Sequence, residues 1–427
     1  VDKASQAEFA KDREFEYQVF REHNCLVEMD EEPPGTMNQE ALRIALDIAL
    51  HLDATPVDEV HVMRKTVIDG SNTSGFQRTS IVACNGHIDS SKGNVAVQMI
   101  AIEEESAGII STADRKATYR LDRLGIPLIE ITTAPDIRDG AHLLEVAEKI
   151  GMVLRATGKV ARGLGTIRQD VNVSTDGGAR VEIKGAQDLK LLPTMVDLEV
   201  GRQTELVKLL AELIRRKRLP VEVSPLDVTS VFKDTKAAIV SNGVNSGAVV
   251  LAQKLPLHKG ILGATLQPDR RYGTEISDYA KKAGVKGMIH SDEDLSKYMI
   301  SASEAGAVKK VLNAGPEDAF ILIVAPIDQA KKAIMNAVYR ANMDYVPEET
   351  RKANPDGTSS FMRPLAGKAR MYPETDVPPI PVTRELLDAL EKSESLDDKK
   401  ARLEKLLNKE MALRILKSRS LHLFESL

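Results

Sequence analysis

The sequence contains no tryptophan, and aromatic residues make up only 4% of its 427 residues. We therefore expect any RNA binding to use shape and phosphate contacts, because a platform of aromatic side chains for base stacking is missing. Only two cysteines, Cys25 and Cys84, are present. Two cysteines without the spacing of a metal site indicate a reducing compartment and no disulfide framework.

Long apolar runs and a strong net charge are also missing. No apolar run approaches the roughly 20 residues that a membrane span needs, and no secretory signal is visible, so we expect a cytoplasmic protein without a membrane partner. The net charge is -5, which argues against a generally basic nucleic-acid coat but leaves room for a local basic face. The length predicts two to four domains, and the start at Val1 instead of Met indicates missing N-terminal sequence.

The N-terminal quarter predicts short elements with ordinary helix and strand signals. We expect a helix over 3–23, a strand over 25–29, and a turn over 33–38 that ends in the N-cap Asn38. A helix with a buried face should follow over 41–50, and a strand over 57–64. The next segment, 69–79, is rich in Gly, Ser, Asn and Thr, and Arg64 and Lys65 before it and Arg78 within it supply positive charge. It suits phosphates, although a polar hairpin would have the same composition.

Acidic residues occur where strands are expected. Strands over 80–82 and 95–102 lead into Glu103, Glu104 and Glu105. Strand alternation puts Glu103 and Glu105 on one face and Glu104 on the other, although an acidic triplet can also form a solvated loop. Glu130 lies inside the apolar strand 126–131, and a buried carboxylate there needs a partner such as Mg²⁺.

The next segments combine a helix with a charged hairpin. A helix is expected over 141–157, and two strands, 168–174 and 180–184, flank a turn at 176–178. One face of this hairpin is charged, although surface hairpins often have such a face. The charged residues are Arg168, Asp170 and Asn172 on the first strand and Arg180, Glu182 and Lys184 on the second.

The remaining chain predicts mixed helices and strands. We expect helices over 187–218 and 327–341, a helix–glycine–strand unit over 275–289, and further helices from 383 onward. Extended segments are expected over 220–232, 260–266 and 319–325, and a polar loop over 348–362.

Five ordered motifs resemble the B-type and E-type subunits of tRNA-dependent amidotransferases. They are Glu104-Glu105-Ser106-Ala107-Gly108, the runs 121–131, 168–174 and 180–184, and Gly201-Arg202-Gln203. The segment 69–79 is more similar to the E-type subunit, the archaeal Glu-tRNA(Gln) form. The segments 275–289 and 319–341 resemble an insert of bacterial-type aspartyl-tRNA synthetases, and the Pro-Glu-x-Asp-x-Pro-Pro run at 373–379 resembles the one that closes the family's cradle domain.

The resemblance implies an α+β fold. It would comprise a glutamine-synthetase-like cradle of antiparallel sheet, an inserted α+β domain and a C-terminal helical domain. The implied boundaries are 1–235 for the first part of the cradle (kinase) domain, 236–345 for the insert, 346–382 for the return to the cradle, and 383–427 for the start of the helical domain. The family's opening Gly-x-Glu-Ile-His strand, which contributes to its metal site, and its tRNA-binding tail domain have no counterpart between Val1 and Leu427, so we expect a fragment.

The resemblance also implies a reaction. ATP would phosphorylate the γ-carboxylate of Glu on Glu-tRNA(Gln), and ammonia from an asparaginase-like partner (a D-type subunit) in a hetero-oligomer would give Gln-tRNA(Gln). We expect Mg²⁺ on Glu103, Glu105, Glu130 and Asp170, with Glu104 as the alternative to Glu103. The expected catalytic residues are Glu105, Glu130, Asp170, Arg168 and Lys184. ATP or the acceptor end would contact Arg64, Lys65, Ser71, Asn72 and Arg180.

Two other functions fit part of the sequence. A non-catalytic tRNA-binding module would use the insert and the helical tail while the cradle is inert. An aspartyl-tRNA synthetase would match only the insert, and the catalytic motifs expected of it are not visible. Hydrolysis of ATP that depends on Glu-tRNA(Gln) would distinguish the amidotransferase from the binding module, and a synthetase would show pyrophosphate exchange with aspartate and ATP.

Overall fold

The chain forms two compact units. The computed structural model describes residues 9, 13–113, 116–163, 165–365, 367, 370–390, 394–418 and 421–426. Unit 1 comprises Val1–Gln169, Gln187–Pro193 and Pro364–Leu427, and unit 2 comprises Asp170–Ala186 and Thr194–Arg363. Each unit therefore consists of more than one segment, and unit 1 joins the two ends of the chain.

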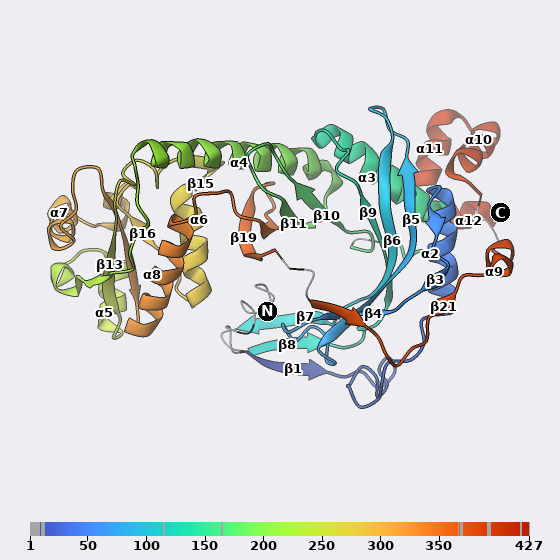
Figure 1. The fold of residues 1–427 in the computed structure, drawn as a ribbon, viewed down its shortest axis with the longest axis horizontal. Helices are drawn as coiled ribbons and strands as arrows, with labels where there is room; N and C mark the ends of the chain where they lie inside the picture. The colour runs from blue at the N-terminus through green and yellow to red at the C-terminus, as the bar shows by residue number, and fades with distance from the viewer. Residues whose placement is uncertain are drawn as a thin grey trace. The chain divides into compact units, whose positions relative to one another are not determined.

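A six-stranded antiparallel sheet is the centre of unit 1 (Figure 1). Its order is β20-β4-β5-β6-β9, and β2 pairs with β5 beside this path. β5 and β6 are long and continuous, so their ends extend beyond the other strands. The strands are β2 (Thr55–Pro56), β4 (Met63–Thr66), β5 (Phe76–Ile88), β6 (Val95–Glu104), β9 (Pro127–Thr133) and β20 (Met371–Pro373).

Two helices, α2 (Gln39–His51) and α3 (Gly140–Ala156), pack on this sheet. As predicted, Asn38 caps α2 by accepting a hydrogen bond from the backbone N–H of Ala41. α2 contributes Leu42 and Leu46 to an apolar cluster with Val82 and Ile102 of the sheet. One face of the sheet is therefore buried under α2.

The N-terminal predictions were partly wrong. Residues 14–18 of the predicted helix 3–23 form strand β1 (Glu14–Gln18), and residues 3–8 and 10–12 lie outside the described part of the chain. Strand period explains the difference, because Phe15 and Tyr17 alternate along β1 and both contact the ring of Tyr119. The predicted strand 25–29 is a series of turns, and the predicted strand 57–64 is interrupted between β3 (Glu59–Val60) and β4.

Smaller elements complete unit 1. β1 pairs in parallel with β8 (Lys116–Arg120), which forms a hairpin with β7 (Gly108–Ala113). β21 (Ile380–Pro381) pairs with β3. Short C-terminal helices confirm the helical prediction from 383 onward: α9 (Arg384–Asp388), α10 (Leu396–Leu406), α11 (Lys409–Lys417) and α12 (Leu421–Glu425).

Unit 2 contains a three-layer α/β/α arrangement (Figure 1). Its sheet has the order β12-β13-β17-β16. Alternate residues of β17 enter two cores: Ile321 packs with α6 and α8, and Phe320 packs with α5 and α7. The strands are β12 (Leu226–Asp227), β13 (Val249–Leu255), β16 (Ile289–His290) and β17 (Ala319–Ala325), and the helices are α5 (Ala238–Asn245), α6 (Tyr272–Ala280), α7 (Ala302–Val311) and α8 (Ile327–Ala341).

The predictions for this part had mixed outcomes. Strand 319–325 and helix 327–341 were confirmed as β17 and α8. The predicted strand 260–266 is mostly turn, ending in β14 (Thr265–Gln267), which pairs with β15 (Arg270–Arg271). The segment 220–232 ends in the short helix η2 (Thr229–Phe232), and two further one-turn helices are η3 (Lys281–Ala283) and η4 (Leu295–Tyr298).

A second sheet in unit 2 overturns the predicted loop 348–362. Its order is β10-β11-β18-β19, and β11 and β18 pair in parallel. The predicted hairpin 168–184 is present as β10 and β11, whereas the predicted loop forms β18 and β19. The bounds are β10 (Gln169–Val173), β11 (Val181–Ala186), β18 (Glu349–Ala353) and β19 (Ser359–Pro364).

A long helix, α4 (Leu192–Arg215), follows the one-turn helix η1 (Leu189–Leu191) and confirms the prediction over 187–218. Gln203 on α4 accepts hydrogen bonds from Thr175 and from the backbone N–H of Ala179, so it fixes the β10–β11 turn. A Cβ atom on Gly178 would lie 2.1 Å from the Gln203 Oε1 atom, which explains why glycine occupies this turn.

A network of buried charges connects α4, α6, α8 and β18 within unit 2. It has three arginines and three glutamates, each at most 2% exposed. Glu275 is the centre, because it accepts hydrogen bonds from Arg202 at 2.7 Å and from Arg340 at 2.9 Å and lies 3.1 Å from Arg351. The six residues are Glu199, Arg202, Glu275, Arg340, Glu349 and Arg351.

The α+β prediction was confirmed, because antiparallel sheets and helices occur in both units. The cradle arrangement and the predicted domain boundaries stay predictions. None of the helices in the described ranges is both long enough and apolar enough to span a membrane.

Candidate functional site

Three successive glutamates at the end of β6 each contact a different cation. Glu103 forms an ion pair with Lys65 of β4. Glu104 accepts a hydrogen bond from the Arg78 Nε atom of β5 at 2.9 Å. Glu105 accepts from Arg168 at 2.6 Å and from Arg123 at 2.8 Å. The acidic triplet is therefore part of an ordered set of ion pairs in unit 1.

The register of the sheet assigns these groups to two faces. Glu103 pairs with Thr79, and Lys65 pairs with Gln77. Directly paired residues point to the same side of a sheet, and so do Thr79 and Gln77, which are two residues apart on β5. Lys65 and Glu103 therefore share a side. We call this side the Lys65 face. Ile102, which packs with α2, precedes Glu103, so the Lys65 face is the one that α2 does not cover.

Glu130 also lies on the Lys65 face. It pairs with Ala101, two residues before Glu103 on β6, so Glu130 and Glu103 point to the same side. The sequence interpretation placed Glu130 in a buried environment, and this was wrong, because Glu130 is exposed. An exposed carboxylate does not incur the desolvation cost that the interpretation invoked, and it is accessible to a ligand.

Glu105 lies one residue past β6 and connects two further segments. Its backbone N–H donates to the Ile126 carbonyl, and its own carbonyl accepts from Gly125. Its side chain is only 13% exposed, whereas Arg123 and Arg168 are 45% and 41% exposed. Two half-exposed guanidinium groups around one carboxylate have a net positive charge, which suits a phosphate group.

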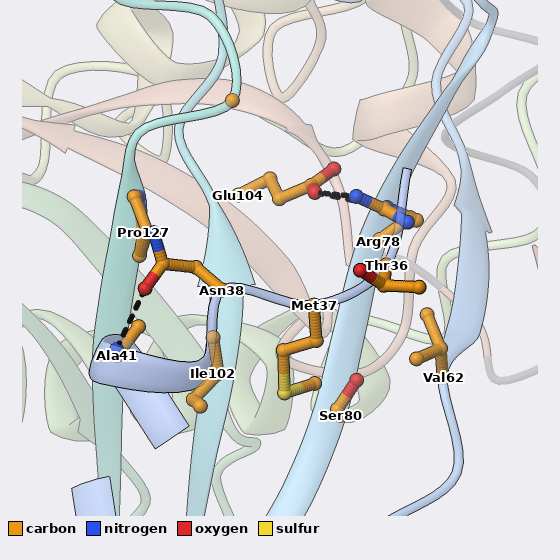
Figure 2. A pocket seen from close by; sticks show the side chains of 11 residues that line it. Thr36, Met37, Asn38, Ala41, Val62, Arg78, Ser80, Ile102, Glu104 and Pro127 are labelled. Atoms are coloured by element: carbon orange, nitrogen blue, oxygen red, sulfur yellow. Dashed lines mark hydrogen bonds and ion pairs between the residues drawn. The ribbon is translucent and has the colours of Figure 1, made fainter. Parts of the chain in front are cut away.

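The opposite side of the sheet, which we call the Arg78 face, contains a pocket (Figure 2). Its volume is about 170 Å³. Glu104 and Arg78 point toward one another among its lining residues in Figure 2, and Arg78 also donates to the Gly35 carbonyl at 2.6 Å. The pocket is lined by Thr36, Met37, Asn38, Ala41, Val62, Arg78, Ser80, Ile102, Glu104, Gly125 and Pro127. Sequence patterns did not indicate this pocket, because its lining comes from separate segments of the chain.

The loop between β4 and β5 is held in place by two tyrosines of the three-stranded sheet β1-β8-β7. The Tyr17 hydroxyl donates to the Gly70 carbonyl and the Tyr119 hydroxyl donates to the Asp69 carbonyl, both at 2.7 Å. Asn72 is buried and accepts from the Ser106 hydroxyl at 3.1 Å. Ser71 donates to Asp69. The Ser71 carbonyl also accepts a hydrogen bond from the backbone N–H of Ala107 at 2.8 Å. Ser71 and Asn72 thus join the loop to the segment after Glu105, and their predicted ligand contacts stay predictions.

Three predicted residues, Asp170, Arg180 and Lys184, belong to unit 2. Lys184 donates to Asp170 at 2.6 Å and lies 3.2 Å from Glu182. Burial lowers the pKa of Lys184, but the two carboxylates outweigh burial and raise it above its usual value. Lys184 is therefore a fixed cation between two acids at neutral pH. Arg180 precedes β11 and is exposed.

Arg64 has partners that sequence analysis missed. Its Nε and Nη2 atoms donate to the two carboxylate oxygens of Glu374, each at 2.7 Å, and Nη2 also donates to Asp376 at 2.9 Å. These acids are the Glu and the Asp of the Pro-Glu-x-Asp-x-Pro-Pro run, and paired acids beside a conformationally restricted proline could have indicated a cation partner. Arg64 lies opposite Arg78, so it is on the Arg78 face and Lys65 is on the other. Its predicted contact with nucleotide stays a prediction.

The carboxylates of the described ranges do not form a complete metal site by themselves. Within the described ranges, no group of three or more His, Cys, Asp or Glu side chains could hold a metal ion. Glu103 and Glu130 provide two carboxylates on one face. Mg²⁺ at nucleotide sites commonly uses one or two carboxylates together with phosphate oxygens and water, so this donor set fits a site that needs the nucleotide to be complete.

Comparison with known proteins identifies the family. A family model described as "GatB/GatE catalytic domain" matches residues 7–388. The chain belongs to the GatB/GatE family. The sequence-based assignment to this family is therefore confirmed.

Curated members of the GatB/GatE family resemble this chain over most of its length. The E-type subunit of the glutamyl-tRNA(Gln) amidotransferase of Pyrococcus furiosus is 52% identical over 390 residues, which cover 90% of this chain and 62% of that protein. The corresponding subunit of Methanosarcina acetivorans is 49% identical over 419 residues, 97% of this chain and 66% of that protein. That of Methanopyrus kandleri is 47% identical over 405 residues, covering 93% and 63%. The chain thus spans less than two thirds of the length of these relatives.

Proposed function

We propose that this GatB/GatE chain carries the kinase and amidation site of a Glu-tRNA(Gln) amidotransferase. ATP would transfer its γ-phosphoryl group to a γ-carboxylate oxygen of the glutamyl ester, releasing ADP. Ammonia would then attack the acyl phosphate carbon, and phosphate and a proton would leave to give Gln-tRNA(Gln). The names of the curated relatives, glutamyl-tRNA(Gln) amidotransferase subunits, support this substrate.

The cluster of carboxylates and cations at the end of β6 carries the proposal. Phosphoryl transfer depends mainly on positioning and on charge compensation. Arg123 and Arg168 around Glu105 would bind phosphate oxygens, and Lys65 on β4, which β5 separates from β6, would add a further cation. Each cation is oriented by a carboxylate before any ligand binds, so little reorganisation is needed.

Glu103 and Glu130 would hold Mg²⁺ together with the nucleotide. When bound, this ion would neutralise part of the phosphate charge. Asp170 and Lys184 of unit 2 are proposed as further catalytic residues. An asparaginase-like partner subunit would supply the ammonia, which makes the active enzyme a hetero-oligomer.

The test is ATP hydrolysis that depends on Glu-tRNA(Gln), measured with the full-length protein and its partner subunit. Glu130→Gln and Asp170→Asn should each lower the rate by about 10²–10³-fold, the loss typical for one electrostatic group at a phosphoryl or acyl centre. Glu348→Gln, at an exposed position, is the matched control.

Three results would contradict the proposal. Retained hydrolysis in both variants would show that the kinase site lies elsewhere. Amidation of Asp-tRNA(Asn) in preference to Glu-tRNA(Gln) would show that the substrate is wrong. Specific binding of Glu-tRNA(Gln) by the wild-type complex without any ATP hydrolysis would favour the non-catalytic tRNA-binding module.

A further inference from the structure

Arg64 of β4 is restrained by two carboxylates and an aromatic ring. The fork of its guanidinium meets both oxygens of Glu374, and Asp376 adds a third contact. Its guanidinium carbon also lies 4.1 Å from the centre of the Phe76 ring, a cation–π distance. The Glu374 side chain is completely buried, and Arg64 is 18% exposed.

The charge balance favours a structural use of Arg64. Burial raises the pKa of Glu374, but the hydrogen bond and charge of Arg64, together with the backbone N–H of Asp376 and the charge of Arg78, outweigh burial and leave the pKa below its usual value. The same hydrogen bond raises the pKa of Arg64. Two carboxylates compensate one guanidinium, so Arg64 has no excess positive charge to offer a phosphate.

Backbone pairing alone gives β4 limited support on its outer side. β4 has four residues and its outer neighbour β20 has three. Their register places Met371 opposite Lys65 and Tyr372 opposite Arg64, and the backbone N–H of Glu374 donates to the Val62 carbonyl at 2.9 Å. A three-residue edge strand is weakly held by itself, because few hydrogen bonds offset its loss of conformational entropy.

Successive strand residues point to opposite faces. A restraint that fixes Arg64 on the Arg78 face therefore also fixes the direction of Lys65 on the Lys65 face. Lys65 contacts Glu103 there and is only 18% exposed. A rotation or slip of β4 would separate Lys65 from Glu103.

We propose that Glu374 is a positioning residue that holds Lys65 against Glu103 by clamping Arg64. The return segment from Pro364 onward would then be part of the phosphate-binding apparatus without touching the nucleotide. This inference deepens the proposed function and rests on it for its kinetic consequence, whereas its structural consequence can be measured independently.

The structural arm measures the accessibility of Lys65 to acetylation by an N-hydroxysuccinimide ester, read by mass spectrometry on the full chain. Glu374→Gln keeps the shape of the side chain and removes its charge. We expect the labelling rate of Lys65 to rise roughly fivefold or more. Losing about 1 kcal/mol of local restraint raises by that factor the fraction of molecules in which Lys65 is separated from Glu103. Lys297, an exposed lysine of unit 2, should keep its rate.

Two further variants provide the controls. Glu385→Gln removes an exposed glutamate of unit 1 and should leave Lys65 labelling unchanged. Glu374→Asp keeps the charge, so it should restore part of the protection. If Glu374→Gln unfolds the chain, all lysines will react faster, and the Glu374→Asp variant then provides the test. A labelling rate that rises above the wild-type rate at Lys65 but not at Lys297 supports the clamp. An unchanged Lys65 rate in this variant overturns it.

The kinetic arm uses the complex with its partner subunit. Glu374→Gln should lower kcat/KM for ATP about tenfold, which corresponds to about 1.4 kcal/mol, chiefly through KM because a phosphate contact is loosened. Unchanged Lys65 labelling in a folded Glu374→Gln chain would overturn the inference. If the wild-type complex did not hydrolyse ATP, the proposed function would be contradicted. The labelling of Lys65 would then be the test of whether Glu374 positions Lys65.

Discussion

The buried charge network of unit 2 makes a sharp prediction for Glu275. Burial alone would raise the pKa of this carboxyl, but Arg202, Arg351 and Arg340 hold it well below its usual range. Glu275→Gln keeps the volume and removes the charge. The three arginines would then face two glutamates, leaving one uncompensated positive charge at a position that is 2% exposed.

The expected magnitude follows from that imbalance. Removing one member of a buried ion network typically costs about 3–5 kcal/mol, because the remaining charge is desolvated without a partner. For a unit of this size each kcal/mol shifts the melting temperature by about 2–4 °C. We therefore expect unit 2 to melt roughly 6–20 °C lower in the Glu275→Gln variant.

The assay is calorimetry combined with native-state hydrogen exchange of the α6 amides, which report on unit 2 alone. Glu205→Gln on α4 is the matched control, since it breaks an exposed pair with Lys208 and should cost at most about 1 kcal/mol. If Glu275→Gln changed stability no more than Glu205→Gln does, the network would not stabilise unit 2 as argued.

Two other perturbations test different regions. His258 is buried, and burial lowers its pKa to about 4 from 6.5. The unfolded chain therefore binds a proton at this histidine first as the pH falls. The free energy of unfolding should decrease by about 3 kcal/mol between pH 6.5 and 4. Urea unfolding should show that His258→Gln flattens this pH dependence, and an unchanged slope would exclude His258 as the cause. Lys281→Ala with Lys282→Ala should weaken tRNA binding and reduce its salt dependence, measured by filter binding at several salt concentrations beside Lys297→Ala. An unchanged salt slope would remove this segment from the RNA footprint.

The predicted elements that were confirmed have strong local signals. Residues 319–325 are an uninterrupted apolar run, and residues 327–341 repeat small apolar residues at helical spacing. Asn38 has the side chain and the position of an N-cap. In these cases the local preference and the tertiary environment agree.

The elements that were missed depend on distant partners. Glu349, Thr350 and Arg351 are polar, which predicts a loop, yet all three are buried in β18. Charges on α4 and α6 compensate Glu349 and Arg351, and the Thr350 hydroxyl donates to Glu182 of β11. Tyr17 pairs with a ring that lies about 100 positions later. No window of neighbouring residues contains such information.

The same reasoning explains what could be predicted at the site. Alternation along β6 separates Glu103 from Glu104, as the contacts with Lys65 and Arg78 indicate. The identity of each cation could not be predicted, because it depends on the register of β4, β5 and β6. Glu130 was expected to be buried because its neighbours are apolar, but it lies on the face without α2.

The bond between Arg64 and Glu374 joins residues 310 positions apart. Ribosomes add about 5–20 residues per second, so roughly 15–60 s pass between the synthesis of these two residues. During that interval the nascent chain has β4 at an unfinished sheet margin, with a polar backbone available to other chains. Such a polypeptide should be sensitive to chaperone depletion during translation, and slowing the ribosome between the codons for Arg64 and Glu374 should increase its aggregation.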